Sequence, residues 1–171
     1  LPNGKVLVTG GLGPAGGNRS SAEVFDPATE TWNPTGNMAK GRYSHAATLL
    51  SNGNVLIVGS TDTNDPDSIA EVYDPSSGTF FTVGGLAAER YDHTATLLGD
   101  GTVLVVAGII AGGDSTTTEI FDPSAGGFSH GESLQVSRYL HTATMLPNGD
   151  VLVAGGYGPG VVGQMESYTS H

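Results

Sequence analysis

The chain has 171 residues, with 17 acidic and six basic side chains and a formal net charge of −11 at neutral pH. This acidity argues against binding to nucleic acid or insertion into an anionic membrane, because both need basic protein surface. The chain contains no cysteine, which excludes disulfides, thiolate metal sites and a cysteine nucleophile. No apolar run approaches the ~18 residues of a transmembrane helix, and no signal peptide is visible.

One stretch recurs at a spacing of 48 residues, starting at Arg42, Arg90 and Arg138. Each copy reads R-Y-x-H, followed by small residues, a turn that contains glycine, and a run rich in Val and Leu. The chain opens on a partial copy, over residues 1–11, that lacks the Arg and the His. A repeat of this length with strand-like content predicts a propeller or a solenoid.

The repeats divide the chain into partial units over 1–41 and 138–171 and complete units over 42–89 and 90–137. Asn52-Gly53 predicts a two-residue hairpin turn with positive φ at both positions. Asp74-Pro75 predicts a turn in which the carboxylate bonds the backbone ahead of it. In unit 42–89 we expect strands over 43–50, 54–58, 69–73 and 79–83.

The distribution of side-chain size predicts how these strands pack. The first strand of each unit carries small residues such as Ala95, whereas the third and fourth carry aromatic residues such as Tyr73 and Phe80. Propeller blades crowd at the axis and separate at the rim, so they need small residues inside and large ones outside. Each unit is therefore predicted to be a four-stranded antiparallel meander with its first strand innermost.

The combination of R-x-x-H, N-G-x-V-L-V-x-G-G and E-V-F-D-P-x-x-x-x-W resembles the kelch repeat of β-propellers, in its bacterial form. The resemblance implies an all-β fold of four-stranded antiparallel blades around a central channel. The double glycine of the motif is intact in the first and last units, and we align it with changed pairs in the two middle units. These pairs are Gly10-Gly11, Gly59-Ser60, Gly108-Ile109 and Gly155-Gly156.

The predicted strands number three, four, four and three along the chain, which makes about three and a half blades. Closed propellers typically need four to eight blades. We therefore expect a single propeller segment that belongs to a longer parent chain or completes its ring with other copies. The start at Leu1 instead of Met fits a mature product or a fragment. Its two end faces should expose apolar surface.

The meander places the tight turns at one face and the variable loops at the other. The R-Y-x-H stretches open the innermost strands at the variable-loop face, where a protein or carbohydrate ligand would bind. The candidate binding residues are Arg42, Tyr43, His45, Arg90, Tyr91, His93, Arg138, Tyr139 and His141. A structural interpretation competes: the arginines would clamp adjacent blades through Glu23, Glu71, Glu119 and Glu166, and the histidines would be buried donors to the backbone.

Galactose oxidase, a kelch propeller with a copper radical site, is similar in this region. His45, His93 and His141 match its metal-binding His, but the tyrosine here directly follows Arg, one position early, and so points to the opposite side of the strand. The cysteine that cross-links the radical tyrosine is missing. We therefore expect no copper, no other metal and no cofactor. No Ser-His-Asp or paired-carboxylate arrangement identifies a catalytic site.

The sequence thus predicts a non-enzymatic binding or assembly module, and the resemblance implies a secreted or cell-surface bacterial protein. The alternative is a propeller fragment of a galactose-oxidase-like copper oxidase whose catalytic residues lie outside this chain. Asp62, Asn64, Asp65 and Asp67 could hold Ca²⁺, but they lack the EF-hand pattern and Pro66 interrupts them, which favours a solvated acidic loop. Tyr157 and Trp32 could stack on sugars, but the place of Trp32 in the repeat predicts a core residue.

Overall fold

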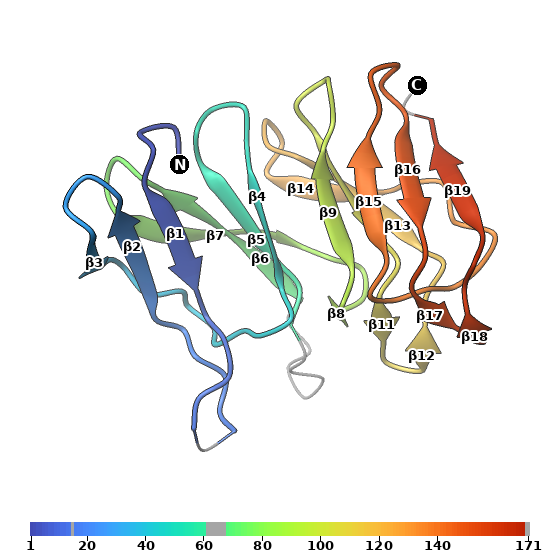
Figure 1. The fold of residues 1–171 in the computed structure, drawn as a ribbon, viewed down its shortest axis with the longest axis horizontal. Helices are drawn as coiled ribbons and strands as arrows, with labels where there is room; N and C mark the ends of the chain where they lie inside the picture. The colour runs from blue at the N-terminus through green and yellow to red at the C-terminus, as the bar shows by residue number, and fades with distance from the viewer. Residues whose placement is uncertain (15, 61–67, 170–171) are drawn as a thin grey trace.

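The computed structural model describes residues 1–14, 16–60 and 68–169, and in these residues it is all-β (Figure 1). Four sheets lie side by side as blades with three, four, four and three strands, as predicted. Within the described residues, no helix is long and apolar enough to cross a membrane. The first blade holds β1 (Val6–Thr9), β2 (Ala22–Asp26) and β3 (Thr31–Pro34), and the second holds β4 (Ala46–Leu49), β5 (Val55–Val58), β6 (Ile69–Asp74) and β7 (Thr79–Gly85).

The third and fourth blades follow the same plan. The third holds β9 (Thr94–Leu97), β10 (Val103–Val106), β13 (Thr118–Asp122) and β14 (Gly127–His130), and the fourth holds β15 (Thr142–Met145), β16 (Val151–Ala154) and β19 (Met165–Tyr168). All neighbouring strands in these sheets are antiparallel, in meander order. β4, β9 and β15, the first strand of each repeat, contact one another in sequence, so the small residues lie where the blades crowd. The predicted blades, antiparallel meanders with the first strand of each repeat innermost, are confirmed.

Short strand pairs extend the blades at the lower edge of Figure 1. β8 (Arg90–Tyr91) pairs with β11 (Ile109–Ile110), which also pairs with β12 (Gly113–Asp114). In the fourth blade, β17 (Tyr157–Gly158) forms a hairpin with β18 (Gly160–Val161). The strands β11, β12, β17 and β18 lie in loops that the sequence marked as variable, and β8 opens the R-Y-x-H stretch of the third blade.

The core lies between the blades, because each middle strand is apolar on both faces. In β10, Val103 and Val105 pack toward the second blade, whereas Leu104 and Val106 pack toward the fourth. All four are fully buried. Strands that are buried on both faces are near-continuous apolar runs, which explains the V-L-V-V and V-L-I-V sequences.

Two local predictions were wrong. The Asn52-Gly53 hairpin is not a two-residue turn: Gly53 N–H bonds Leu50 C=O, Leu50 N–H bonds Asn54 C=O, and only Gly53 has positive φ. This is the three-residue loop that ends in a left-handed glycine. The innermost strand begins at Ala46, not at Tyr43, because Ser44 adopts φ 52° and breaks the extended backbone.

The alignment of the double glycine also changes in the third blade. The residue in register with Gly59 is Ala107, which has φ 56°, and Gly108 follows it with φ 89°. The left-handed pair is therefore Ala107-Gly108, not Gly108-Ile109. Ile109 already belongs to β11.

Aromatic pairs close the outer part of the first three sheets. Tyr73 lies 4.8 Å from Phe80, and the centroids of Phe25 and Trp32 are 5.0 Å apart. Tyr73 is buried between blades, but Trp32 is 52% exposed. The prediction that Trp32 is a core residue was wrong, since no described residues cover its side of the first blade.

Candidate functional site

The two ends of the blades differ as the sequence predicted. The hairpin turns and the Asp-Pro turns share the upper edge in Figure 1, and residues 52–54 lie beside residues 74–76 around one shallow pocket. In each Asp-Pro turn the carboxylate accepts a backbone N–H two residues ahead, as for Asp74 and Ser76. The opposite edge, here called the loop face, carries residues 10–14 and 16–20 and the β11–β12 and β17–β18 hairpins.

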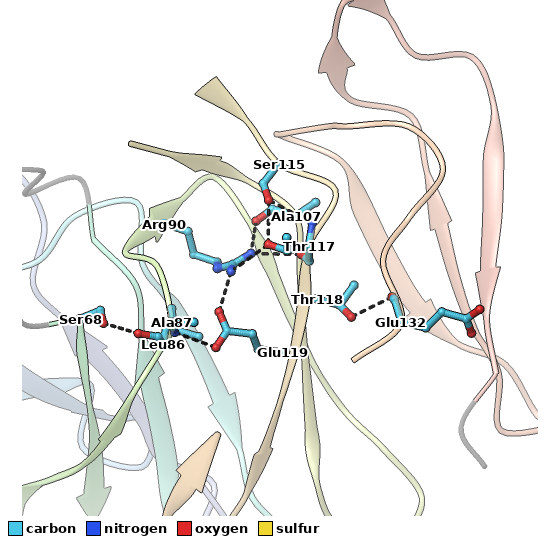
Figure 2. Close-up of polar contacts among 10 residues, drawn as sticks. All are labelled: Ser68, Leu86, Ala87, Arg90, Ala107, Ser115, Thr117, Thr118, Glu119 and Glu132. Carbon is cyan, nitrogen blue, oxygen red and sulfur yellow. Dashed lines mark hydrogen bonds and ion pairs between the residues drawn. The ribbon is translucent and has the colours of Figure 1, made fainter. Parts of the chain in front are cut away.

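The side chain of Arg90 is buried in the third blade, where it contacts several polar groups (Figure 2). Its guanidinium donates to Glu119 Oε1 at 2.6 Å and to the carbonyls of Ala107 at 2.9 Å and Thr117 at 3.1 Å. Burial lowers the pKa of Arg90, and the charge of Glu119 opposes that fall, so the arginine remains a cation. The predicted pairing of Arg90 with the Glu of its repeat is confirmed.

The same contacts recur in the second and fourth blades. Arg42 pairs with Glu71 at 3.2 Å, and Arg138 pairs with Glu166 at 2.5 Å. Each carboxylate also accepts a backbone N–H from the connection that arrives from the preceding blade, as Glu119 does from Ala87 at 2.8 Å. The Glu therefore fixes both the arginine and the inter-blade connection.

The expected clamp between blades is made by a different atom of the arginine. The side-chain pair lies within one repeat, because Arg90 and Glu119 both belong to residues 90–137. The backbone carbonyl crosses to the preceding blade instead: Arg90 C=O accepts the N–H of Ser60 at 3.0 Å. Arg42 and Arg138 do the same with Gly11 and Gly108.

The rings of His45 and His93 pack against a glycine of the preceding blade, Gly10 and Gly59 respectively. A Cβ at Gly59 would collide with the ring of His93, and one at Gly10 would lie 2.9 Å from the ring of His45. The ring of His45 bonds Thr9 Oγ1 at 2.9 Å, and that of His141 bonds Thr94 Oγ1 at 3.0 Å. These partners are hydroxyls, so the expectation of histidine donors to the backbone was wrong.

His93 differs from the other two, since neither of its ring nitrogens has a hydrogen-bond partner. The residue that corresponds to Thr94 in the preceding blade is Ala46, which has no hydroxyl to offer. Burial lowers the pKa of His93 to about 3, and the positive charge of Arg90 lowers it further. The backbone of Val58 lies near the ring and acts in the opposite direction, although it forms no hydrogen bond with it. Burial likewise lowers the pKa of His45 and of His141 to about 4.

The tyrosines of the R-Y-x-H stretches stand at the loop face. Tyr91 pairs with Ile109, and Tyr139 forms a bridge to Tyr157, with the two rings 5.8 Å apart. The residue after each tyrosine has a left-handed backbone: φ is 52° at Ser44 and Asp92 and 53° at Leu140. Non-glycine residues rarely adopt this conformation, and it is concentrated at binding and switch sites.

Sequence reasoning missed these three left-handed residues, because Ser, Asp and Leu share no recognisable property. They are connected in space: the N–H of Leu140 bonds Asp92 C=O at 2.9 Å, and the N–H of Asp92 reaches Ser44 C=O at 3.4 Å. The positional repeat was the only available signal, since all three occupy the variable position of R-Y-x-H. They form a row across three blades.

Large apolar side chains are exposed at the loop face of the fourth blade. Leu140 is 58% exposed, Tyr157 is 51% exposed and Val161 is 83% exposed. Tyr157 pairs with Val161 across the β17–β18 hairpin, and Leu140 follows the bridged Tyr139. We call these three residues the apolar rim. Exposed apolar groups that gather at one site mark interaction surfaces.

Within the described residues, no three His, Asp or Glu side chains are arranged to hold a metal ion. The nine candidate residues do not form one cluster of free side chains. The arginines are buried against Glu and carbonyl groups, and the histidines pack between blades, which leaves the tyrosines nearer the surface. The acidic cluster at Asp62–Asp67 lies outside the described residues.

Residues 2–39 match the family model of the Kelch motif. The chain carries a Kelch motif. The match covers β1, β2, β3 and the connection to the next blade, and the later kelch-type blades repeat its strand order with the Arg–Glu pairing added. No curated protein matches the sequence.

Proposed function

We propose that this kelch segment is a non-enzymatic binding module whose loop face docks a protein partner. The observation that carries the proposal is the apolar rim, which exposes Leu140, Tyr157 and Val161 beside backbone held in a strained conformation. Tyrosine supplies a large contact area at little entropic cost, and the apolar core of an interface is depleted of charged residues. Kelch blades are a rigid scaffold on which such loops can vary without loss of the fold.

The buried polar residues support a structural role in place of a catalytic one. The terminal guanidinium nitrogens of Arg42, Arg90 and Arg138 are engaged by Glu and carbonyl acceptors, and all three side chains are buried, so they are not free to bind substrate. The chain has no cysteine for a cross-linked radical tyrosine. We therefore infer that elemental analysis of the dialysed protein will find well below one copper per chain.

The same proposal places the module outside a bacterial cell. The resemblance of the whole repeat pattern to bacterial kelch repeats supports this, as does the lack of cysteine, which makes folding independent of the redox state of the compartment. The charge of −11 supports solubility and disfavours nucleic-acid partners.

The test is a selection of binding peptides from a displayed random library against the full chain, with a glycan array in parallel. We expect selected peptides to lose affinity for Val161→Ser on the loop face and to retain it for Pro147→Ser, an exposed residue at the turn edge of the same blade. Peptides that respond only to Pro147→Ser, or binding confined to glycans, would overturn the proposal of a protein-binding loop face.

A further inference from the structure

The third residue of R-Y-x-H lies at the loop face of each blade and changes from one blade to the next. It is Ser44 in the second blade, Asp92 in the third and Leu140 in the fourth, whereas the Arg, Tyr and His around it are the same in all three. The backbone is also the same, because φ is 52° or 53° at all three positions. A side chain that varies on a fixed backbone frame favours a role in recognition over a role in folding.

A second variable position lies on the hairpins of the loop face. Asp114 pairs with Ile109 across β11 and β12, and Val161 pairs with Tyr157 across β17 and β18. Ile109 and Tyr157 correspond, because each of them pairs with the tyrosine of its own R-Y-x-H stretch. At this position too, the third blade carries a carboxylate where the fourth carries an aliphatic side chain.

These positions form one continuous band along the lower edge of Figure 1, from β12 through β8 to β18. The acidic part of the band meets the apolar part where Leu140 N–H bonds Asp92 C=O at 2.9 Å. Backbone pairing and chain continuity connect its members in the order Asp114, Ile109, Tyr91, Asp92, Leu140, Tyr139, Tyr157 and Val161. We call these eight residues the loop-face band.

The band is open to solvent even in blades that have a neighbour on both sides. The second blade packs between the first and the third, and the third packs between the second and the fourth. Ser44 in the second blade and Asp114 in the third are nevertheless exposed. Leu140 and Val161 occupy the corresponding positions of the fourth blade, so their exposure is a property of the position in the repeat.

The carboxylates of Asp92 and Asp114 have no cation of their own. Within the described part of the chain, neither forms an ion pair. Arg90 and Arg138 are the only Lys or Arg residues in the sequence from 90 to 171, and both are buried against a Glu of their own blade. With a net charge of −11 on the chain, this surface attracts cationic groups.

We propose that the loop-face band binds a basic, partly apolar segment of a protein partner. A Lys or Arg of this segment lies on Asp92 and Asp114, and a neighbouring apolar side chain packs on Leu140 and Val161. The charges set the orientation and the association rate, whereas covering the aliphatic side chains supplies affinity. This inference rests on the proposed protein-binding function of the loop face and specifies the chemistry of the partner.

The probe is a pair of displayed peptide libraries, selected in parallel against the full 171-residue chain. One library has Lys-Leu fixed at the centre of an otherwise random sequence, and the other has Glu-Leu. We expect enrichment from the Lys-Leu library only. The leading peptide is then labelled with fluorescein, and its affinity for each variant is measured by anisotropy at low and high salt.

The acidic and apolar parts of the band should respond differently to salt. Asp92→Asn and Asp114→Asn should each weaken binding about threefold at low salt, and these effects should fade at about 0.5 M salt. Leu140→Ser should weaken binding about tenfold at either salt concentration, and Ser44 shows that serine holds this backbone conformation. Glu30→Gln, an exposed residue at the turn edge of the first blade, should leave the affinity unchanged.

The outcomes separate the chemistry of the partner from the function of the loop face. Equal enrichment from both libraries, or binding that neither Asp→Asn variant weakens, would overturn the basic partner. The protein-binding loop face would still stand if Val161→Ser reduced that binding. No enrichment, or peptides that bind Val161→Ser as tightly as wild type, would overturn both. A tetralysine peptide with the affinity of the selected one would show an unspecific acidic surface and would also overturn the inference.

Discussion

Corresponding residues of the first and third blades lie in two different environments, exposed in the first and buried in the third. In the third blade Glu119 binds Arg90, Gly108 contacts the Tyr91 carbonyl, and Val103 and Val105 are buried. In the first blade the corresponding Glu and Val side chains are exposed, and nothing lies within 4 Å of the Cβ position at Gly11. The repeat sequence sets the shape and chemistry of each blade, and the neighbouring blade and inner strand determine burial, as in other repeat proteins whose stability resides in nearest-neighbour interfaces.

The largest expected effect is that of Arg90→Ala, which would convert the third blade toward the state of the first. The substitution leaves Glu119 buried without its cation, and breaking such a pair costs about 3–5 kcal/mol of unfolding free energy. Urea denaturation should show the loss. Arg19→Ala, at an exposed position, should change stability by less than about 0.5 kcal/mol. Unchanged midpoints for both variants would show that the buried pair contributes nothing.

The next test compares one glycine inside a blade interface with its counterpart at the free side of the fourth blade. Gly59→Ala forces a Cβ against the ring of His93 and the Arg90 carbonyl, and should cost about 3 kcal/mol. Gly155→Ala meets nothing within 4 Å, so only its positive φ opposes the change, at about 1–2 kcal/mol. Ala107 shows that alanine can hold this conformation.

A double-mutant cycle separates the two contributions to the Gly59 effect. Combining Gly59→Ala with His93→Ala should recover part of the cost, because the smaller side chain makes room for the added Cβ. Strict additivity would contradict the contact between these two residues. Thermal or urea unfolding provides the measurement for each of the four proteins.

Acid sensitivity should distinguish the middle blade interface from an ordinary surface. The pKa of His93 is lowered to about 3 from an unfolded value near 6.5, so the unfolded chain binds the proton first. Its contribution to stability is complete above pH 6.5 and is lost as the pH falls toward 3. Between pH 7 and pH 5 the loss is about 2 kcal/mol.

His93→Gln removes this titration, so the stability difference between wild type and variant should shrink by about that amount over the same range. Urea unfolding at several pH values measures it. A difference that stays constant from pH 7 to pH 5 would contradict a buried, neutral His93.

The smallest expected effect is an increase in the stability of the protein. Ala46→Thr places at the second blade the hydroxyl that Thr94 offers to His141 in the third. If the new hydroxyl reaches the ring of His93, the added bond should stabilise the protein by about 1 kcal/mol. Thermal unfolding tests this, and Ala46→Val provides a control of similar shape without the hydroxyl. Equal effects of both substitutions would contradict the pairing.

Several features followed from the sequence because they depend on local chemistry repeated at a fixed spacing. The strand count and order, the Asp-Pro turns and the Arg90–Glu119 pair all required only the 48-residue period and the preferences of each residue type. Strand boundaries were less accurate. The left-handed backbone at Ser44 delays the start of the predicted strand, and the residue type serine does not predict that conformation.

The sequence by itself determined the blade: its four strands, its small inner residues, its outer aromatic pairs and the Glu that binds an arginine. Only the tertiary structure decided in which blades these residues are buried and have hydrogen-bond or ion-pair partners. His93 lacks a partner because the second blade has Ala46 at the position where the third has Thr94. Trp32 and Glu23 are exposed because no blade or inner strand among the described residues covers them. Burial and pairing arise between repeats, so they depend on neighbours that no single repeat encodes.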